Sequence, residues 1–208
     1  MAQVELDHVL IATEDLAHTA SAWAEEHGLV SVEGGRHPDW GTANRIVPLG
    51  TSYLELVAVV DEREAAQSTF GRWVSDRASR SGRPIGWAVR PENLDETAGR
   101  LGLTPQVGSR VKPDRSFVRW RTAGVDEAPK EPSLPFFIEW AAESTFPGLL
   151  PVGVDPIASI SGLDIEADPE QLSSWLGPHA LPLRVLRGSG GIRRVLLTTP
   201  RGEIALGA

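Results

Sequence analysis

The chain has 208 residues and no cysteine, and its 41% hydrophobic and 23% charged residues indicate an ordinary soluble globular protein of one or two domains. The lack of cysteine excludes disulfides and thiolate metal sites, and the net charge of −8 argues against nucleic acid as the main partner, because phosphate binding needs a basic surface. No apolar run approaches the roughly 20 residues that span a bilayer, and the N-terminus does not resemble a secretory signal, so we expect a cytoplasmic protein with no membrane partner.

Residues 1–64 are predicted to form one structural unit. Residues 4–12 are apolar and rich in β-branched side chains, as in a largely buried strand. Apolar residues then recur at helical spacing from Leu16, and Gly28 suits the end of that helix. Three further strands are expected at residues 29–33, 42–48 and 52–60. The unit is therefore strand, helix and three strands, abbreviated βαβββ.

The same order of elements returns twice along the chain. In residues 84–146 the expected elements are a strand at 85–90, a helix from Leu94 to Gly102, and strands at 106–111, 116–122 and 135–142. In residues 154–208 the copy is fainter, with a strand at 157–167, a helix capped by Asp168, and strands at 182–187, 191–198 and 202–207. Residues 65–83 read as a linker helix. We predict an α+β fold of repeated βαβββ modules, the third of them partial and at the C-terminus.

A glutamate recurs in the last strand of each copy. We align Glu55, Glu139 and Glu203 in the segments TSYLELVA, LPFFIEWA and TPRGEIAL. Because strand residues alternate between faces, Glu55 should share a face with Tyr53, and Glu139 with Phe137. A buried carboxylate needs a partner, so the glutamates either line an open cup or pair with arginines on the neighbouring strands, namely Arg45, Arg119 and Arg193.

Two segments, LDHVLIATEDL and GGRHPDWGTANRIVPLGTSYLELV, resemble the glyoxalase-like branch of the vicinal-oxygen-chelate superfamily, which includes glyoxalases, bleomycin-resistance proteins and extradiol dioxygenases. The resemblance covers about residues 3–143. It implies that two modules pair and that their sheets curl into a cup for a small-molecule ligand. It also implies a divalent metal, held by residues on the first and last strands of each module.

Carried over to this sequence, the resemblance implies His8, Glu55 and Glu139 as metal ligands, with the two glutamates also as catalytic candidates. The fourth ligand position, counted back from the second helix, is Gly86, which has no side chain to bind a metal. One imidazole and two carboxylates can hold Zn²⁺, Mn²⁺, Ni²⁺ or Fe²⁺ and leave positions open for substrate. The implied function is metal-assisted isomerase or lyase chemistry on a vicinal-oxygen substrate, with one glutamate moving a proton.

Other candidates for substrate contact are His37, Trp40 and Asn44, in a predicted loop, and Tyr53 and Phe137 on the cup strands. His37 is also a candidate to supply the missing metal ligand, or simply to pin its loop. The alternative function is a metal-free protein that binds or sequesters a small molecule on the same fold. The unpaired sheet face of the third copy is expected to be covered either in a homodimer or by docking on the first two copies.

Overall fold

A computed structural model describes residues 4–112, 114–153, 158–199 and 201–207. The first module comprises β1 (Val4–Ala12), α1 (Leu16–His27), β2 (Val32–His37), β3 (Thr42–Pro48) and β4 (Tyr53–Val59). Two short helices follow, α2 (Glu62–Ala65) and α3 (Thr69–Arg77). The second module comprises β5 (Arg83–Pro91), α4 (Leu94–Leu101), β6 (Gln106–Val111), β7 (Phe117–Ala123) and β8 (Phe136–Trp140).

A 3₁₀ turn, η1 (Pro147–Leu149), precedes the C-terminal part. That part comprises β9 (Ser159–Ala167), α5 (Pro169–Leu176), β10 (Leu183–Arg187), β11 (Gly191–Thr199) and β12 (Gly202–Leu206). The predicted start of the third module at residue 154 lies outside the described residues.

The three helices that follow the first strand of each copy, α1, α4 and α5, begin and end at local sequence signals. Asp15, Asn93 and Asp168 each accept hydrogen bonds from backbone N–H groups in the first turn of α1, α4 and α5. Gly28 and Gly102 end α1 and α4 in the left-handed conformation, with φ of 71° and 68°. No helix in the described part of the chain is long and apolar enough to cross a membrane.

The two modules close into one eight-stranded barrel with the strand order β1-β4-β3-β2-β6-β7-β8-β5. Within each module the last strand runs parallel to the first, β4 beside β1 and β8 beside β5. Antiparallel pairing joins the modules, extensively between β1 and β5 and through one residue pair, Arg36 with Val111, between β2 and β6. The predicted α+β fold of paired βαβββ modules is confirmed.

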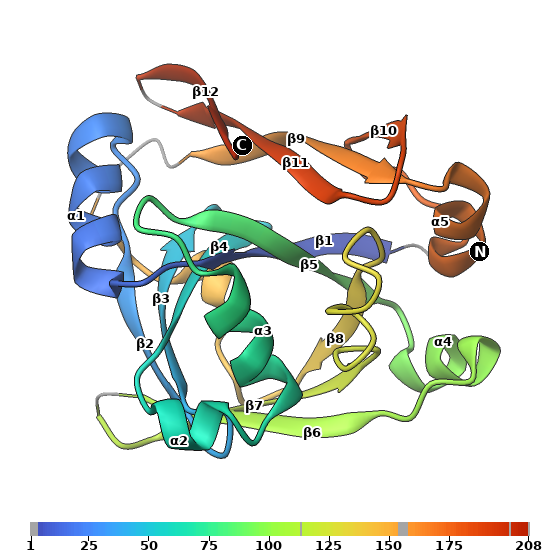
Figure 1. The fold of residues 1–208 in the computed structure, drawn as a ribbon, viewed down its shortest axis with the longest axis horizontal. Coiled ribbons are helices and arrows are strands. Elements are labelled where there is room, and N and C mark those ends of the chain that lie inside the picture. Colours follow the sequence, from blue (N-terminus) through green and yellow to red (C-terminus); the bar gives the residue numbers. More distant parts are fainter. Residues whose placement is uncertain (1–3, 113, 154–157, 200, 208) are drawn as a thin grey trace.

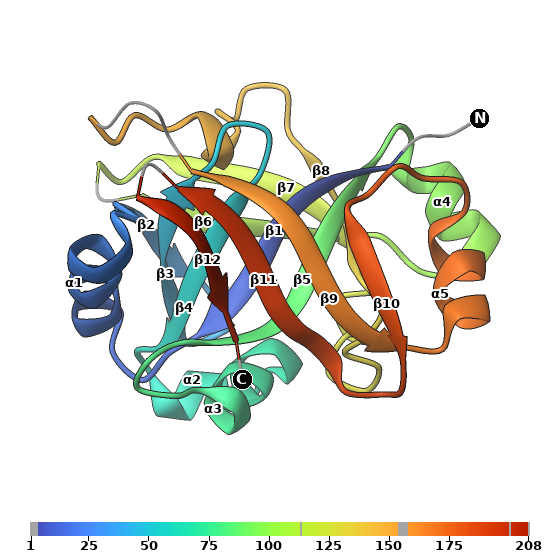
Figure 2. The same cartoon turned by 90° about the horizontal axis from the view of Figure 1, so that it is seen from above.

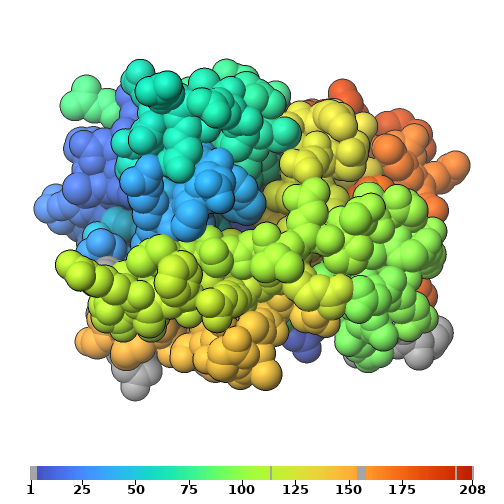
Figure 3. Space-filling model, turned by 90° about the horizontal axis from the view of Figure 1, so that it is seen from below, coloured from blue at the N-terminus to red at the C-terminus, as the bar shows by residue number. Residues whose placement is uncertain are grey.

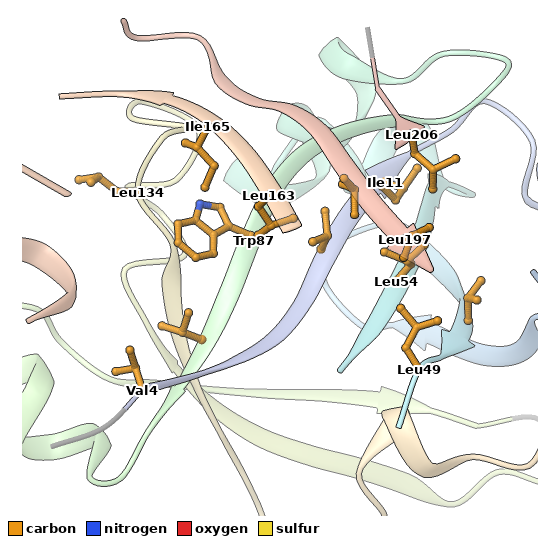
Figure 4. Packing of buried hydrophobic residues seen from close by; sticks show 14 of the residues in the cluster. Val4, Ile11, Leu49, Leu54, Trp87, Leu134, Leu163, Ile165, Leu197 and Leu206 are labelled. Atoms are coloured by element: carbon orange, nitrogen blue, oxygen red, sulfur yellow. The ribbon is translucent and has the colours of Figure 1, made fainter. Parts of the chain in front are cut away.

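The C-terminal strands form a separate sheet with the order β10-β9-β11-β12. The elements follow the βαβββ order, but β9 runs parallel to β10 and has no pairing with the last strand. This sheet lies as a second layer over β1 and β5 (Figures 1 and 2). Figure 4 shows Leu163 and Leu197 of the sheet with Ile11, Leu54 and Trp87 of the barrel in one buried cluster. Of the two predicted ways to cover the third copy, the structure shows docking on the first two.

A second apolar cluster fills the barrel itself. Its members include Leu10, Val57 and Phe136 from the strands, and Phe70 and Trp73 from α3, which covers one end of the barrel. The barrel thus has an outer core, beneath the C-terminal sheet, and an inner core. The inner core surrounds the polar side chains described below.

Strand β2 differs from its prediction. We expected a strand at residues 29–33 followed by a loop, but β2 runs from Val32 to His37 and contains two glycines. A Cβ on Gly34 would lie 2.0 Å from Asn44 Oδ1, and one on Gly35 would lie 2.0 Å from the carbonyl oxygen of Val111. These glycines allow close approach inside a strand rather than marking a loop. His37 is therefore the last residue of β2 and not part of a loop.

Candidate active site

The interior of the barrel holds a cavity of about 30 Å³, which is room for about one or two water molecules. Much of its wall is aromatic and comes from both modules and from the segment that covers one end: Trp40, Tyr53, Phe70, Trp120, Phe136 and Trp140. The polar side chains in the wall are His8, His37, Asn44, Glu55, Arg110 and Thr122. Ionisable groups in so apolar a site need specific partners.

A bulge in β1 brings two ionisable side chains together at this cavity. Leu6 pairs with Val89 of β5, whereas His8 pairs with the adjacent Ala88, so Asp7 is an extra residue in β1. Leu6 packs on the outside of the barrel, yet His8, two residues further along, lines the cavity. The bulge therefore turns both Asp7 and His8 toward the interior.

Asp7 is fully buried and holds His8 in one orientation. Its Oδ1 accepts a hydrogen bond of 2.5 Å from His8 Nδ1. Its Oδ2 accepts from Arg90 Nη1 and from Trp140 Nε1, both at 2.9 Å. Arginine and tryptophan only donate, so Asp7 is the acceptor throughout. The network assigns the Nδ1 proton to His8 and leaves Nε2 facing the cavity.

Glu55 of β4 faces His8 and is only 7% exposed. Its Oε2 lies 3.5 Å from His8 Nε2, and its Oε1 accepts a hydrogen bond of 2.8 Å from Asn44 Nδ2. Two acceptor atoms at such a separation attract each other only when one of them carries a proton. His8 and Glu55 together can therefore hold one exchangeable proton.

His37 supports this pair from the end of β2. Its Nδ1 lies 2.9 Å from Thr42 Oγ1, and its Nε2 accepts from Asn44 Nδ2 at 3.3 Å. Burial lowers the pKa of His37 to about 4, with Arg110 acting in the same direction and the Glu55 carboxylate in the opposite one. His37 is therefore neutral at pH 7, and its acceptor nitrogen fixes the Asn44 amide against Glu55.

The other predicted contacts on this side of the cavity are aromatic. Tyr53 stacks on His8 with ring centroids 4.6 Å apart and an interplanar angle of 19°. Burial raises the pKa of Tyr53 well above its ordinary value, so the phenol is neutral. Trp40 packs against His37 and Phe70, with centroids 5.5 Å and 4.6 Å away. The structure thus brings His8, Glu55, His37, Trp40, Asn44 and Tyr53 to one cavity.

Two predicted site residues do not reach the cavity, because the register of β8 differs from our alignment by one residue. Ile138 lines the cavity, whereas Glu139 is half-exposed on the other face and pairs with Arg121 at 3.1 Å. Phe137 packs in the outer core. The predictions that Glu139 shares a face with Glu55, as a ligand or base, and that Phe137 contacts substrate are wrong.

Matching positions in the two modules follow from strand pairing. His8 lies opposite Tyr53 just as Ala88 lies opposite Phe136, so Ala88, and not Gly86, is the counterpart of His8. By the same register, the counterparts of His8, Glu55 and Asn44 are Ala88, Ile138 and Trp120. The first module therefore supplies a polar wall and the second a mostly apolar one.

The three specific cross-strand pairs given as the alternative, Glu55 with Arg45, Glu139 with Arg119 and Glu203 with Arg193, are not those observed, although Glu139 does pair with an arginine of the neighbouring β7. Arg45 turns away from the cavity and hydrogen-bonds to Ser31. The partners observed in the described residues are Ser31 for Arg45, Arg121 for Glu139 and Glu166 for Arg193. Glu55 instead depends on Asn44 and His8 inside the barrel.

The side-chain atoms in this cavity that could act as metal ligands do not fit the predicted metal site. The described residues contain no group of three or more His, Asp or Glu side chains placed to hold an ion. The Asn44 amide nitrogen is within hydrogen-bond distance of both Glu55 Oε1 and His37 Nε2. Of the cavity atoms that could bind a metal, this leaves His8 Nε2 and Glu55 Oε2 among the described residues. Protein zinc sites use three or four protein ligands. We therefore derive no chemical step through a metal.

Sequence reasoning missed Asp7 and Arg110. The Asp7–His8 dipeptide in an otherwise apolar strand was a signal, since strict alternation would have sent one of the two side chains into the outer core. Arg110 of β6 is 3% exposed and lines the cavity. It carried no signal, because an arginine in a short, mixed strand is usually solvent-facing.

The fold and the site can be compared with known proteins. A family model for a glyoxalase-like domain matches residues 6–180, which span both barrel modules and α5. The chain belongs to this glyoxalase-like family. The resemblance inferred from the two sequence segments is thus confirmed. A search of curated proteins found no match to the chain.

Several solved structures are similar to this glyoxalase-like chain. A hypothetical protein from Staphylococcus aureus is similar over 97% of this chain and 93% of its own, with a TM-score of 0.74 and 14% identity. Methylmalonyl-CoA epimerase from Mycobacterium tuberculosis is similar over 65% and 85%, with a TM-score of 0.45 and 20% identity. A variant of the Streptomyces coelicolor methylmalonyl-CoA epimerase is similar over 68% and 97%, with a TM-score of 0.46 and 18% identity.

Proposed function

We propose that the barrel cavity is the active site of a small-molecule enzyme that transfers a proton on a carbonyl-bearing substrate, in an isomerase- or lyase-type reaction. The observation that carries the proposal is the buried series Asp7, His8 and Glu55. Burying ionisable groups costs several kcal/mol unless they are paired. Clusters of this kind concentrate at functional sites.

Glu55 and His8, which both face the cavity, act as base and acid. The Glu55 carboxylate takes a proton from the carbon next to the substrate carbonyl, while His8, protonated at Nε2, gives a proton to the carbonyl oxygen. The intermediate is an enol, or an enediol when the neighbouring carbon carries a hydroxyl. From the enol, Glu55 returns its proton to the same carbon and the oxygen returns its proton to His8, which exchanges hydrogen with solvent. From the enediol, Glu55 gives its proton to the former carbonyl carbon while the neighbouring hydroxyl gives its proton to His8, which yields the isomer and restores both side chains. Asp7 keeps the imidazole oriented throughout through its 2.5 Å hydrogen bond to Nδ1.

Substrate entry requires movement of the cavity wall. A volume of about 30 Å³ is too small for a carbonyl compound of several atoms. Trp40 and Trp140 line the cavity and are only partly buried, so they are the rings whose displacement costs least apolar burial. Closure of the same rings over a bound substrate then excludes water from the proton transfer.

Solvent-hydrogen exchange tests this function even where the product is not identified. Small 2-oxo acids, 2-hydroxy aldehydes and 1,2-diketones are incubated with the protein in D₂O, and deuterium entry next to the carbonyl is followed by NMR. We expect exchange with wild type and its loss in His8→Asn and Glu55→Gln. The control is Glu139→Gln, the same substitution at a glutamate on the outside of the barrel, and it should catalyse hydrogen exchange like wild type.

Two results would count against the enzyme: no exchange in any compound, or equal exchange in wild type and Glu55→Gln. Circular dichroism of each variant separates a chemical effect from unfolding. The metal-assisted form of this reaction lacks support, because the cavity offers two free donors only among the described residues.

A second candidate is a metal-free protein that binds a small molecule without changing it. The aromatic lining supports it, since six rings can stack on a ligand with no participation by His8 or Glu55. In that case ligand binding, followed by tryptophan fluorescence, survives in Glu55→Gln, and no compound exchanges hydrogen.

A further inference from the structure

Arg110 is a buried cation that the described part of the protein leaves without an anionic partner. Its side chain belongs to β6, and the residue is 3% exposed. Its one hydrogen bond runs from Nη1 to Asn44 Oδ1 and is long, at 3.4 Å. Its Nε is buried and has no hydrogen-bond partner among the residues that the structure describes. No carboxylate oxygen among the described residues lies within the 4.0 Å of an ion pair.

Two other buried charges in the described structure are compensated by arginines. Asp7 receives hydrogen bonds from Arg90 and Trp140, and Asp164 on the C-terminal sheet receives them from Arg184 and Arg194. A guanidinium has five donors and no acceptor, so an unpaired one needs either water or an anion. The exception at Arg110 therefore indicates that something outside the chain completes it.

Arg110 also stands where the cavity meets the surface. It lines the barrel cavity and, in addition, a surface groove of about 290 Å³. The groove lies between the start of β2, the end of β6, the start of β7 and residues 143–151, and Lys112, Glu33 and Glu143 are on its rim. Figure 3 shows the face of the molecule on which β6 and β7, in yellow-green, run beside the blue residues of β2 and β3. Arg110 therefore lies between this groove and the cavity.

We propose that Arg110 binds the carboxylate of the substrate, so that the substrate class is a small carbonyl compound bearing a carboxylate, such as a 2-oxo acid. A guanidinium and a carboxylate pair through two parallel hydrogen bonds, which fixes the orientation as well as the position. Asn44 contacts both Arg110 and Glu55, so a carboxylate on Arg110 lies one amide group away from the proton-transfer pair. This inference rests on the proposed function.

A thermal-shift comparison of acids with their neutral analogues tests whether Arg110 anchors the substrate carboxylate, a role called the anchor below. Wild type, Arg110→Met and Arg110→Lys are titrated with sodium pyruvate and sodium benzoylformate, and with the neutral methyl esters of both acids, at constant ionic strength with chloride. Arg119→Met, an exposed arginine of the neighbouring β7, is the matched control. We expect the acids to raise the Tm of wild type and of Arg119→Met, and the esters to do so far less.

In Arg110→Met the apparent affinity for the acids should fall roughly ten- to hundredfold, the range for a hydrogen-bonded charge pair. Arg110→Lys should recover part of it, since lysine keeps the charge but not the two-point geometry. The ligand-free Tm of Arg110→Met should be no lower than that of wild type. The anchor is refuted if neither acid shifts wild type, if acid and ester shift it equally, or if the acid effect persists in Arg110→Met.

The anchor and the proposed reaction fail in different ways. If His8→Asn and Glu55→Gln keep the Arg110-dependent binding of acids while no compound exchanges hydrogen, only the reaction is refuted. If hydrogen exchange depends on His8 and Glu55 but acids show no preference for Arg110, only the anchor is refuted.

Discussion

Acidification should destabilise this protein through His37. The imidazole is 2% exposed, and its pKa of about 4 lies below the ordinary value of 6.5 because burial disfavours the charged form. The folded state therefore binds fewer protons than the unfolded state between these two values. The contribution of His37 to stability is complete above pH 6.5 and is lost as the pH falls toward 4. A difference of this size corresponds to about 3 kcal/mol of unfolding free energy.

Urea unfolding followed by tryptophan fluorescence measures this loss. The free energy of unfolding is determined for wild type and His37→Gln at several values between about pH 7 and pH 4. The other titrating groups contribute to both proteins, so the difference between the two curves isolates His37. We expect that difference to move by about 3 kcal/mol against wild type across the range. His18→Gln, which removes an exposed imidazole from α1, is the matched control.

A constant difference between wild type and His37→Gln, within about 0.5 kcal/mol at every pH, would refute the reasoning, since it would show that His37 titrates alike in the folded and unfolded chains. It would also remove the basis for a neutral His37 that accepts a hydrogen bond from Asn44.

Further expectations concern the supports of the site and the outer core. Asp7→Asn should slow the exchange of substrate hydrogen with D₂O by about 10- to 100-fold, the range for loss of a carboxylate that orients a functional histidine. An unchanged exchange rate would exclude this orienting role for Asp7. Gly34→Ala should lower stability by about 1–3 kcal/mol in chemical unfolding, because the added Cβ would lie 2.0 Å from Asn44 Oδ1; a neutral effect would mean that β2 shifts freely. Trp87→Ala should cost about 3–5 kcal/mol, because this fully buried ring lies between the barrel and the C-terminal sheet; a loss below about 1 kcal/mol would contradict that packing. Protein purified without an affinity tag should contain well below one equivalent of metal, and a full equivalent that is lost in His8→Ala would overturn the conclusion that the cavity donors do not fit a metal.

The order of the elements and its repetition along the chain were within reach of the sequence. Hydrophobic periodicity, the helix-ending residues Gly28 and Gly102, and the return of the same order from residue 84 all depend on local preferences, which the chain expresses wherever it folds. Glu55 was located by the glutamate that recurs in the last strand of each copy, and His8 by the resemblance of the opening strand to the glyoxalase-like family.

The register of β8 could not be predicted in the same way. A shift of one residue exchanges the two faces of a strand, and the sequence FFIEW has apolar residues on both. Only the pairing of Phe136 with Ala88 decides that Ile138 faces inward and Glu139 outward. The two glycines of β2 likewise suggested a loop until the neighbouring Asn44 and Val111 showed why a side chain is excluded there.

The local pattern of the chain thus determined which segments are strands and helices and that their order repeats. The resemblance to the glyoxalase-like family added that two modules pair and that His8 and Glu55 belong to an interior site. Tertiary structure alone decided the rest. The bulge in β1 depends on pairing with β5 and turns Asp7 toward His8, and closure of the barrel brings Arg110 from β6 beside Asn44 from β3. The physical reason is that these contacts join residues far apart in sequence, 66 positions for Asn44 and Arg110, and no local preference specifies them.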